Sequence, residues 1–218
     1  MFPVRLLFLL FAVIFLATFI QFGVVSIAFE KLGLSQDSAY LLLLVTLAGS
    51  MINLPLFSVA AQAPATEAPR QRLSRLLGLP QAPFLGRTLI AVNVGGALVP
   101  VAFSLYLLLH HPLAATTVTT AVTVVAAISY LTSAPLPGVG IGMPILVAPL
   151  AAALTAELLA PEQAAALAYI AGALGVLVGA DLLRLSEVKK LGAPVASIGG
   201  AGTFDGIFLS GLIAVLLA

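Results

Sequence analysis

The sequence predicts an all-α fold, a polytopic transmembrane bundle of about seven helices with the amino terminus inside the cell and the carboxyl terminus outside. The composition, the length of the apolar segments and the placement of the basic residues predict it. Of the 218 residues, 61% are hydrophobic and only 8% are charged, whereas a soluble domain usually carries about 25% charged residues. We therefore expect lipid to cover most of the surface and residues 1–218 to form a single transmembrane domain.

The apolar segments have the length that a membrane span requires. A helix needs about 20 apolar residues to cross a hydrocarbon core of about 30 Å. The first segment is longer than the core of a signal peptide and lacks a convincing cleavage site, so we expect a retained span. The predicted spans cover residues 5–29, 38–61, 88–109, 113–131, 140–159, 163–184 and 199–218.

Basic residues mark one side of the predicted bundle. All of them except Lys31 fall before the first span or in connections on that side. Cytoplasmic loops carry the excess of Lys and Arg, so this side is predicted to face the cytoplasm, with the chain in the inner (plasma) membrane. Residues 62–87 are a predicted cytoplasmic basic loop that either only sets the topology or lies on the leaflet as an amphipathic segment. The basic residues of this side are Arg5, Arg70, Arg72, Arg75, Arg87, Arg184, Lys189 and Lys190.

The composition argues against several classes of function. A net charge of +1 provides no basic field for nucleic acid, so no nucleic-acid partner is expected. The chain has no cysteine and its two histidines are adjacent, so no metal site is expected. No phosphate-binding or dinucleotide motif is present, and no cofactor is expected. The glycine-rich runs at residues 138–142 and 199–202 do not follow a predicted strand.

Two aspartates in the carboxyl half are the candidate catalytic residues. An ionisable residue inside a span costs several kcal/mol and is a functional candidate by default. A last span that ends at Ala218 begins near Gly199, which puts Asp205 roughly 9 Å below the cytoplasmic edge at about 1.5 Å per residue. Asp181 lies at the cytoplasmic end of the preceding span. The two acids are therefore expected to approach one another from the same side.

Each aspartate also has a purely structural interpretation. Asp181 and Arg184 are three residues apart and can form an interfacial ion pair. Asp205 can lie in the first turn of a helix capped by Thr203, where the helix dipole favours an anion. A helix that begins at Thr203 is too short to span, so the run SIGGAG before it is then expected at membrane depth, buried in protein or lining a wet cavity.

Two glycine-rich runs are expected to line one cytoplasm-facing site. The run SAPLPGVGIGMP, residues 133–144, leaves too few residues after it for a comfortable crossing. Irregular backbone at membrane depth occurs where helices line a site, although small residues also serve close helix packing. The residues expected to line the site are Gly138, Gly140, Gly142, Gly199, Gly200, Gly202 and Thr203.

Other polar and small residues are expected to serve helix packing. Asn53 and Asn93 are predicted to make hydrogen bonds between helices. Gly172, Gly175 and Gly179 form a stripe of small residues that is predicted to pack against the last span.

The carboxyl half carries motifs that resemble a known family. The strings PLPGVGIGMP, GADLLRL and LGAPVASIGGAGTFDGIFLSG resemble an uncharacterised family of prokaryotic multipass membrane proteins, a domain-of-unknown-function family. The resemblance covers residues 132–218 in these motifs and the rest of the chain in span pattern. It implies a membrane protein and supplies no activity.

A looser resemblance is to the intramembrane aspartyl proteases related to presenilin and prepilin peptidase. Those enzymes place one catalytic aspartate on each of two consecutive helices near the cytoplasmic side, the second after a Gly-x-Gly. The resemblance implies that Asp181 is the first aspartate and Asp205 the second, with Gly200 and Gly202 as the glycine pair. The APL of residues 134–136 is reminiscent of their proline motif. This chain departs in having two residues between the glycines and the second aspartate, no tyrosine before the first, and the proline motif ahead of both.

Three functions remain open from the sequence. In the first, the aspartates activate water to hydrolyse a peptide bond of a membrane-protein substrate. In the second, they bind a cation beside broken helix ends in a small transporter or an ion- or proton-coupled permease that carries a small solute. In the third, they only cap and pair within a non-catalytic membrane scaffold. The lipid bilayer is the expected partner in all three.

Overall fold

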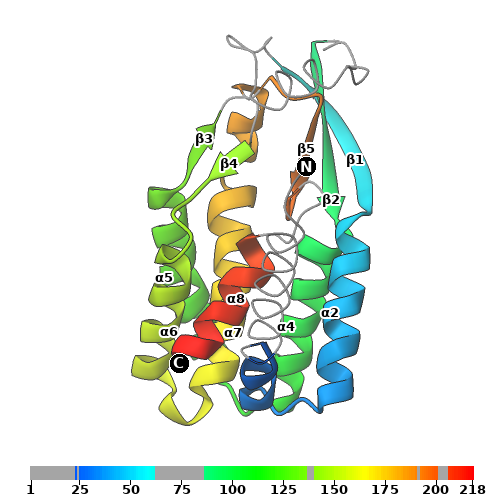
Figure 1. Cartoon of the computed structure of the whole chain (residues 1–218). Helices are drawn as coiled ribbons and strands as arrows, with labels where there is room; N and C mark the ends of the chain where they lie inside the picture. The colour runs from blue at the N-terminus through cyan, green and yellow to red at the C-terminus, as the bar shows by residue number, and fades with distance from the viewer. Residues whose placement is uncertain (1–22, 24, 62–85, 137–139, 191, 201–205) are drawn as a thin grey trace, which may run out of the picture.

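The structure, a computed structural model, describes residues 23, 25–61, 86–136, 140–190, 192–200 and 206–218. This part of the chain is mostly helical, with the helices side by side in a bundle and the strands beyond one end of it (Figure 1). The helices are α2 (Gln36–Ser50), α4 (Val99–His110), α5 (Ala115–Thr132), α6 (Val147–Leu159), α7 (Ala164–Val176) and α8 (Gly206–Leu217). Shorter helical segments are η1 (Val94–Leu98), η2 (Pro161–Gln163), η3 (Leu177–Leu182) and η4 (Leu185–Lys190).

Two helical stretches have the length and hydropathy of a membrane span. They are α5, with 18 residues, and the continuous run Pro161–Leu182, with 22 residues. A third span is obtained if Val25–Lys31 and α2, between which the helix direction bends by 117°, count as one broken span. The stretches Val94–His110, α6 and α8 are apolar but shorter. The structure thus agrees with the spans predicted over residues 113–131 and 163–184, whereas the described parts of the other predicted spans contain shorter helices.

Small residues bring the helices of the bundle into close contact. A Cβ on Gly172 would lie 3.0 Å from the carbonyl oxygen of Ser210 in α8. A Cβ on Gly175 would lie 2.6 Å from Val125 in α5, and one on Gly179 would meet Ala126 of the same helix. The predicted packing of this stripe against the last span is therefore confirmed for Gly172, while the other two glycines pack against α5.

Large apolar side chains lie on the outside of the bundle. In α6, Leu150, Leu154 and Leu158 are exposed along one face, while the alanines of the opposite face are buried. A helix of a water-soluble protein has the reverse arrangement, with its apolar stripe turned towards the core. This surface is suited to contact with lipid.

The strands correct the all-α prediction. Residues 53–60 and 88–93, which were expected to lie within two helical spans, belong to the strands β1 (Asn53–Ala60) and β2 (Arg87–Asn93). Periodicity alone does not separate a buried strand from a buried helix in an apolar run. The β-branched residues Thr88, Ile90 and Val92 favour a strand in β2.

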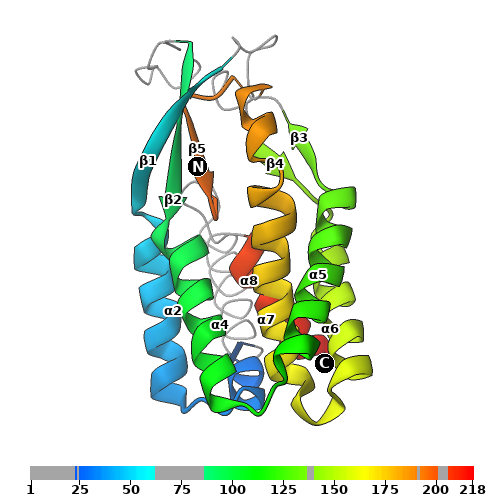
Figure 2. The same cartoon turned by 180° about the vertical axis from the view of Figure 1, so that it is seen from behind.

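The strands form two small sheets beyond the same end of the bundle (Figures 1 and 2). In the first sheet, of order β1-β2-β5, β1 runs antiparallel to β2 with Asn53 opposite Asn93. Strand β5 (Val195–Ile198) runs parallel to β2 with Val195 beside Leu89. The second sheet is the antiparallel hairpin of β3 (Ala134–Leu136) and β4 (Gly140–Gly142). These strands lie at the end of the bundle that the sequence assigns to the cytoplasmic side.

Candidate functional site

The half-buried Asp181 lies in the π-helical segment η3 and reaches the turn that follows β5. Its Oδ2 accepts a hydrogen bond from the backbone N–H of Gly199 at 2.7 Å. Gly199 follows β5 directly, and α8 begins at Gly206. The carboxylate of Asp181 is therefore attached to the glycine run that leads to Asp205.

The turn after β5 requires glycine for two reasons. Gly199 and Gly200 both have a φ of 80°, in the left-handed region that other residues rarely adopt. A Cβ on Gly199 would also lie 2.6 Å from the backbone nitrogen of Ala97 in η1. The turn is thus held between Asp181 of η3 on one side and the backbone of η1 on the other. Segments of π-helix occur mostly as single-turn bulges, frequently at functional sites, and two of them meet this turn.

On the side of the sheet, a network of hydrogen bonds between polar groups supports the turn. The side chain of Asn93, which is 0% exposed, accepts from the N–H of Gly96 through Oδ1 at 2.7 Å. Its Nδ2 donates to the carbonyl oxygen of Ser50 at 2.7 Å and to Oδ1 of Asn53 at 3.1 Å. The hydroxyl of Ser197 donates to the same Oδ1 of Asn53 at 2.6 Å.

These contacts correct the prediction that Asn53 bonds between helices, because it lies in β1, whereas Asn93 does link the end of α2 to the start of η1. The two asparagines join the end of α2 to β1, β2, η1 and β5. Sequence reasoning missed Ser197, because its partner Asn53 is 144 residues away and no local pattern indicates their contact.

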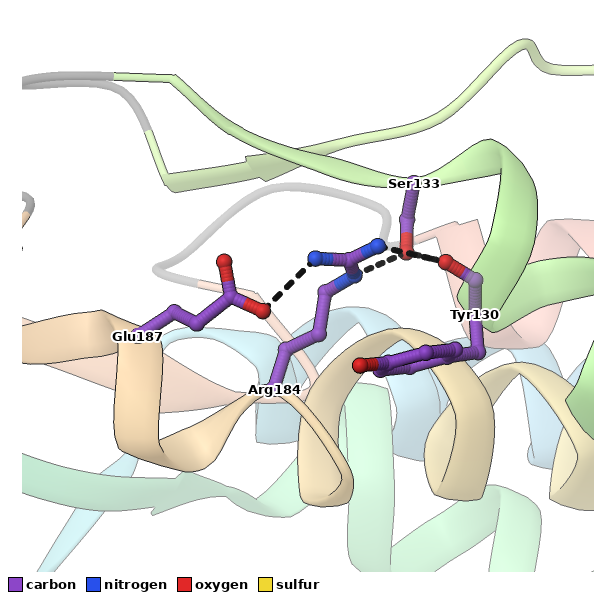
Figure 3. Close-up of polar contacts among 4 residues, drawn as sticks. All are labelled: Tyr130, Ser133, Arg184 and Glu187. Carbon is purple, nitrogen blue, oxygen red and sulfur yellow. Dashed lines mark hydrogen bonds and ion pairs between the residues drawn. The ribbon is translucent and has the colours of Figure 1, made fainter.

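Arg184 ties the end of α5 to the connection after η3 (Figure 3). Its Nε donates to Oγ of Ser133 and one terminal nitrogen donates to Oε1 of Glu187, both at 2.7 Å. The other terminal nitrogen donates to the carbonyl oxygen of Tyr130, whose ring centroid lies 4.5 Å from the guanidinium carbon. The ion pair of Arg184 is thus formed with Glu187 and not with Asp181 as predicted. Arg184 directly precedes η4, and the N–H of Glu187 donates to the carbonyl oxygen of Arg184 at 2.9 Å, so a 3₁₀ turn brings the two side chains to the same side.

Exchange of Arg184 for lysine is expected to lower the free energy of unfolding by about 1–3 kcal/mol, the range for losing hydrogen bonds to charged groups. A single ammonium cannot reach Ser133, Glu187 and the carbonyl of Tyr130 in the planar geometry of a guanidinium. Thermal unfolding of the purified chain in detergent measures the effect. Lys189→Gln, at an exposed position of η4, is the control and is expected to change stability by less than about 0.5 kcal/mol. Equal unfolding temperatures for Arg184→Lys and the native chain would contradict the assignment.

The structure places the remaining predicted site residues in two groups. Gly140 and Gly142 form β4 and pair with Leu136 and Ala134 of β3, so they are strand residues and not irregular backbone. Gly199 and Gly200 form the turn at Asp181, and, contrary to prediction, this glycine run does follow a strand. Four predicted site residues lie outside the part of the chain that the structure describes: Gly138, Gly202, Thr203 and Asp205.

The described site offers a carboxylate, backbone N–H groups and amide and hydroxyl side chains. Within residues 23, 25–61, 86–136, 140–190, 192–200 and 206–218, no group of three or more His, Asp or Glu side chains is placed to hold a metal ion. The chemistry that this arrangement can perform is proton transfer or the binding of a cation by a fixed carboxylate.

Fold and site together define a mostly helical protein with two or three candidate membrane spans and a carboxylate fixed at one end of its bundle. The chain belongs to the DUF1614 family, described as a protein of unknown function, whose model matches residues 47–217. The match includes both aspartates and confirms the resemblance to an uncharacterised family. No curated protein and no solved structure matches the chain, and none of the comparisons supports the resemblance to aspartyl proteases.

Proposed function

We propose that the chain is a multipass protein of the inner membrane that hydrolyses peptide bonds of membrane-protein substrates, with Asp181 and Asp205 as the acid–base pair. The hydrogen bond from Gly199 to Asp181 carries this proposal. It attaches the first carboxylate to the chain segment that ends in the second one, six residues after Gly199.

The arrangement of the helices supports the topology in this proposal. Consecutive helices from α2 to α8 run in alternate directions through the bundle (Figure 1), and their exposed side chains are largely apolar. With residues 5–29 as a first crossing, the chain crosses the bilayer about seven times, and the strands lie on the basic, cytoplasmic side. The site is then open to the cytoplasm.

Two nearby carboxylates divide the work of hydrolysis between them. They cannot both stay ionised cheaply, so one is protonated and serves as the acid. The N–H of Gly199 stabilises a negative charge on Asp181, which makes Asp181 the base. The water oxygen bonds to the carbonyl carbon while Asp181 takes a water proton and Asp205 donates its proton to the carbonyl oxygen. The C–N bond then breaks as Asp181 passes its proton to the leaving nitrogen and Asp205 takes a proton from a hydroxyl of the tetrahedral intermediate, which yields the carboxylic acid and returns both aspartates to their starting states.

Ion- or proton-coupled transport is the second candidate. It is favoured by the apolar helices α6 and α8, which are too short to cross the bilayer alone. The helical halves of discontinuous spans form substrate and ion sites in transporters. The experiment below separates the two functions.

The test is hydrolysis of single-span reporter peptides reconstituted with the full chain in proteoliposomes. The reporters carry a fluorophore at the cytoplasmic end and differ in the sequence next to the membrane, and mass spectrometry locates any cleavage. Release of a soluble fluorescent fragment is expected from the native chain. Glu162→Gln is the matched control, because it removes a carboxylate at the opposite end of the bundle, and it is expected to leave cleavage intact.

Two results would overturn the proposal that the chain hydrolyses peptide bonds. One is the absence of cleavage of every reporter by a folded native chain, and the other is cleavage that persists in the double variant Asp181→Asn, Asp205→Asn. Cation or proton flux into the same vesicles that requires either aspartate, without cleavage, would favour transport.

A further inference from the structure

Helix α2 is too short to cross the hydrocarbon core alone. It has 15 residues, which extend about 22 Å at about 1.5 Å per residue. The hydrocarbon core is about 30 Å thick. The remaining distance of about 8 Å corresponds to two or three residues of extended chain at about 3.3 Å each. Met51 and Ile52 follow α2, and β1 begins at Asn53.

Exposed apolar side chains are found along α2, at the junction that follows it and in β1. Leu44 and Leu47 of the helix are exposed, and so are Met51 and Ile52 at the junction. In the strand, exposure is 44% for Leu54, 54% for Leu56 and 49% for Phe57. In both views β1 leaves the end of α2 and continues along the outer side of the molecule (Figures 1 and 2). A patch of this kind in water would be a site of aggregation or binding.

Several polar groups at the start of the same segment are satisfied inside the protein, among them the N–H and carbonyl oxygen of Ile52. The side-chain oxygen of Asn53 accepts from Ser197 and Asn93, so this amide oxygen requires no water. At the edge of the sheet, Pro55 has no N–H, and the pairing register shifts between Pro55 and Phe57. A proline and a bulge in an edge strand disfavour the addition of another strand. The sequence of β1 thus combines an apolar outer surface with an edge that is poorly suited to a protein partner.

We propose that Met51–Phe57 complete the membrane crossing that α2 begins, with lipid as the partner of their exposed side chains. The hydrocarbon boundary then lies at about Asn53, by the lengths given above, so the side chain of Leu54 lies next to the hydrocarbon, and Leu56 and Phe57 lie in the interfacial layer, where backbone groups reach headgroups and water. The sheet therefore begins at the hydrocarbon boundary. Ser197 bonds to Asn53 and lies two residues before Gly199, so the Asp181–Gly199 contact lies near this boundary. This proposal does not depend on hydrolysis.

Single cysteines test the position of β1, and the native chain, which has no cysteine, supplies the background. Leu54→Cys and Ala60→Cys, in the full chain in vesicles whose cytoplasmic face is outside, are treated with a membrane-impermeant maleimide. Ala60 is exposed and pairs with Arg87 at the far end of the strand. We expect the maleimide to label Leu54→Cys at least about tenfold more slowly than Ala60→Cys, because a thiolate does not form readily in apolar surroundings.

A second readout identifies what covers the strand. A bimane on Leu54→Cys or on Leu56→Cys is expected to be quenched by lipids with a nitroxide on the acyl chain, as a bimane on Leu44→Cys of α2 is. Labelling of Leu54→Cys as fast as Ala60→Cys would overturn the proposal. Protection without quenching would overturn it as well, and a disulfide between two Leu54→Cys chains would identify a second copy as the partner instead. Unfolding temperatures close to that of the native chain establish that each variant is folded.

Discussion

Replacing either Asp181 or Asp205 with asparagine is expected to lower the rate of reporter cleavage at least about 1,000-fold, because the two carboxylates act as one acid–base unit. Asparagine has nearly the shape of aspartate and its side-chain oxygen still accepts the hydrogen bond from Gly199. The fold is therefore expected to survive while the proton transfer is lost.

The double variant distinguishes a shared site from two separate roles. If the two groups work on one water, Asp181→Asn together with Asp205→Asn lowers the rate no further than either change alone. Fragment release from proteoliposomes at equal amounts of folded protein measures all three rates. Losses that multiply in the double variant would show that the aspartates act independently, and a single variant with native activity would remove that residue from the site.

Replacing Gly199 with alanine is expected to cause the largest loss of stability among the changes considered. The left-handed backbone costs a non-glycine residue about 1–2 kcal/mol, and the overlap of a Cβ with the nitrogen of Ala97 adds about 1–3 kcal/mol. The new Cβ lies 2.6 Å from that nitrogen and 2.7 Å from the Cβ of the same alanine, so the turn has to move away from η1. Such a movement would also pull the N–H of Gly199 from Asp181.

Gly33→Ala is a matched control for Gly199→Ala. Gly33 has a φ of 73°, close to that of Gly199, but nothing lies within 4 Å of the position of its Cβ. The control therefore retains the cost of the backbone conformation and removes the overlap. Thermal unfolding in detergent is expected to give the larger decrease for Gly199→Ala. Equal decreases would show that the turn does not press against η1.

Apolar length and small-residue patterns predicted a part of the helical fold. The runs at residues 113–131 and 163–184 are apolar and long, and both form helices of span length. The close approach of Gly172 to α8 also follows from a local pattern, since residues without large side chains permit backbone contact. These features depend on residues near one another in the sequence or on composition.

The sheet and the contacts of the site depend on residues far apart in the sequence. Strand β2 pairs with β5 across a separation of more than 100 residues, and no local signal indicates such a pairing. The apolar runs that contain β1 and β2 have the length of spans, so their strands were predicted as helix. Gly199 was predicted to belong to a glycine-rich run that enters the membrane. Its hydrogen bond to Asp181 became visible only in the structure.

The most direct test of the account is the distance between the carboxyl groups of Asp181 and Asp205 in an experimental structure of the chain in a lipid nanodisc. The account predicts that both carboxyl groups lie within hydrogen-bond reach of one water, which puts their nearest oxygens about 5 Å apart. A separation of more than about 10 Å, with protein between the two groups, would contradict it, because no single water could then exchange protons with both.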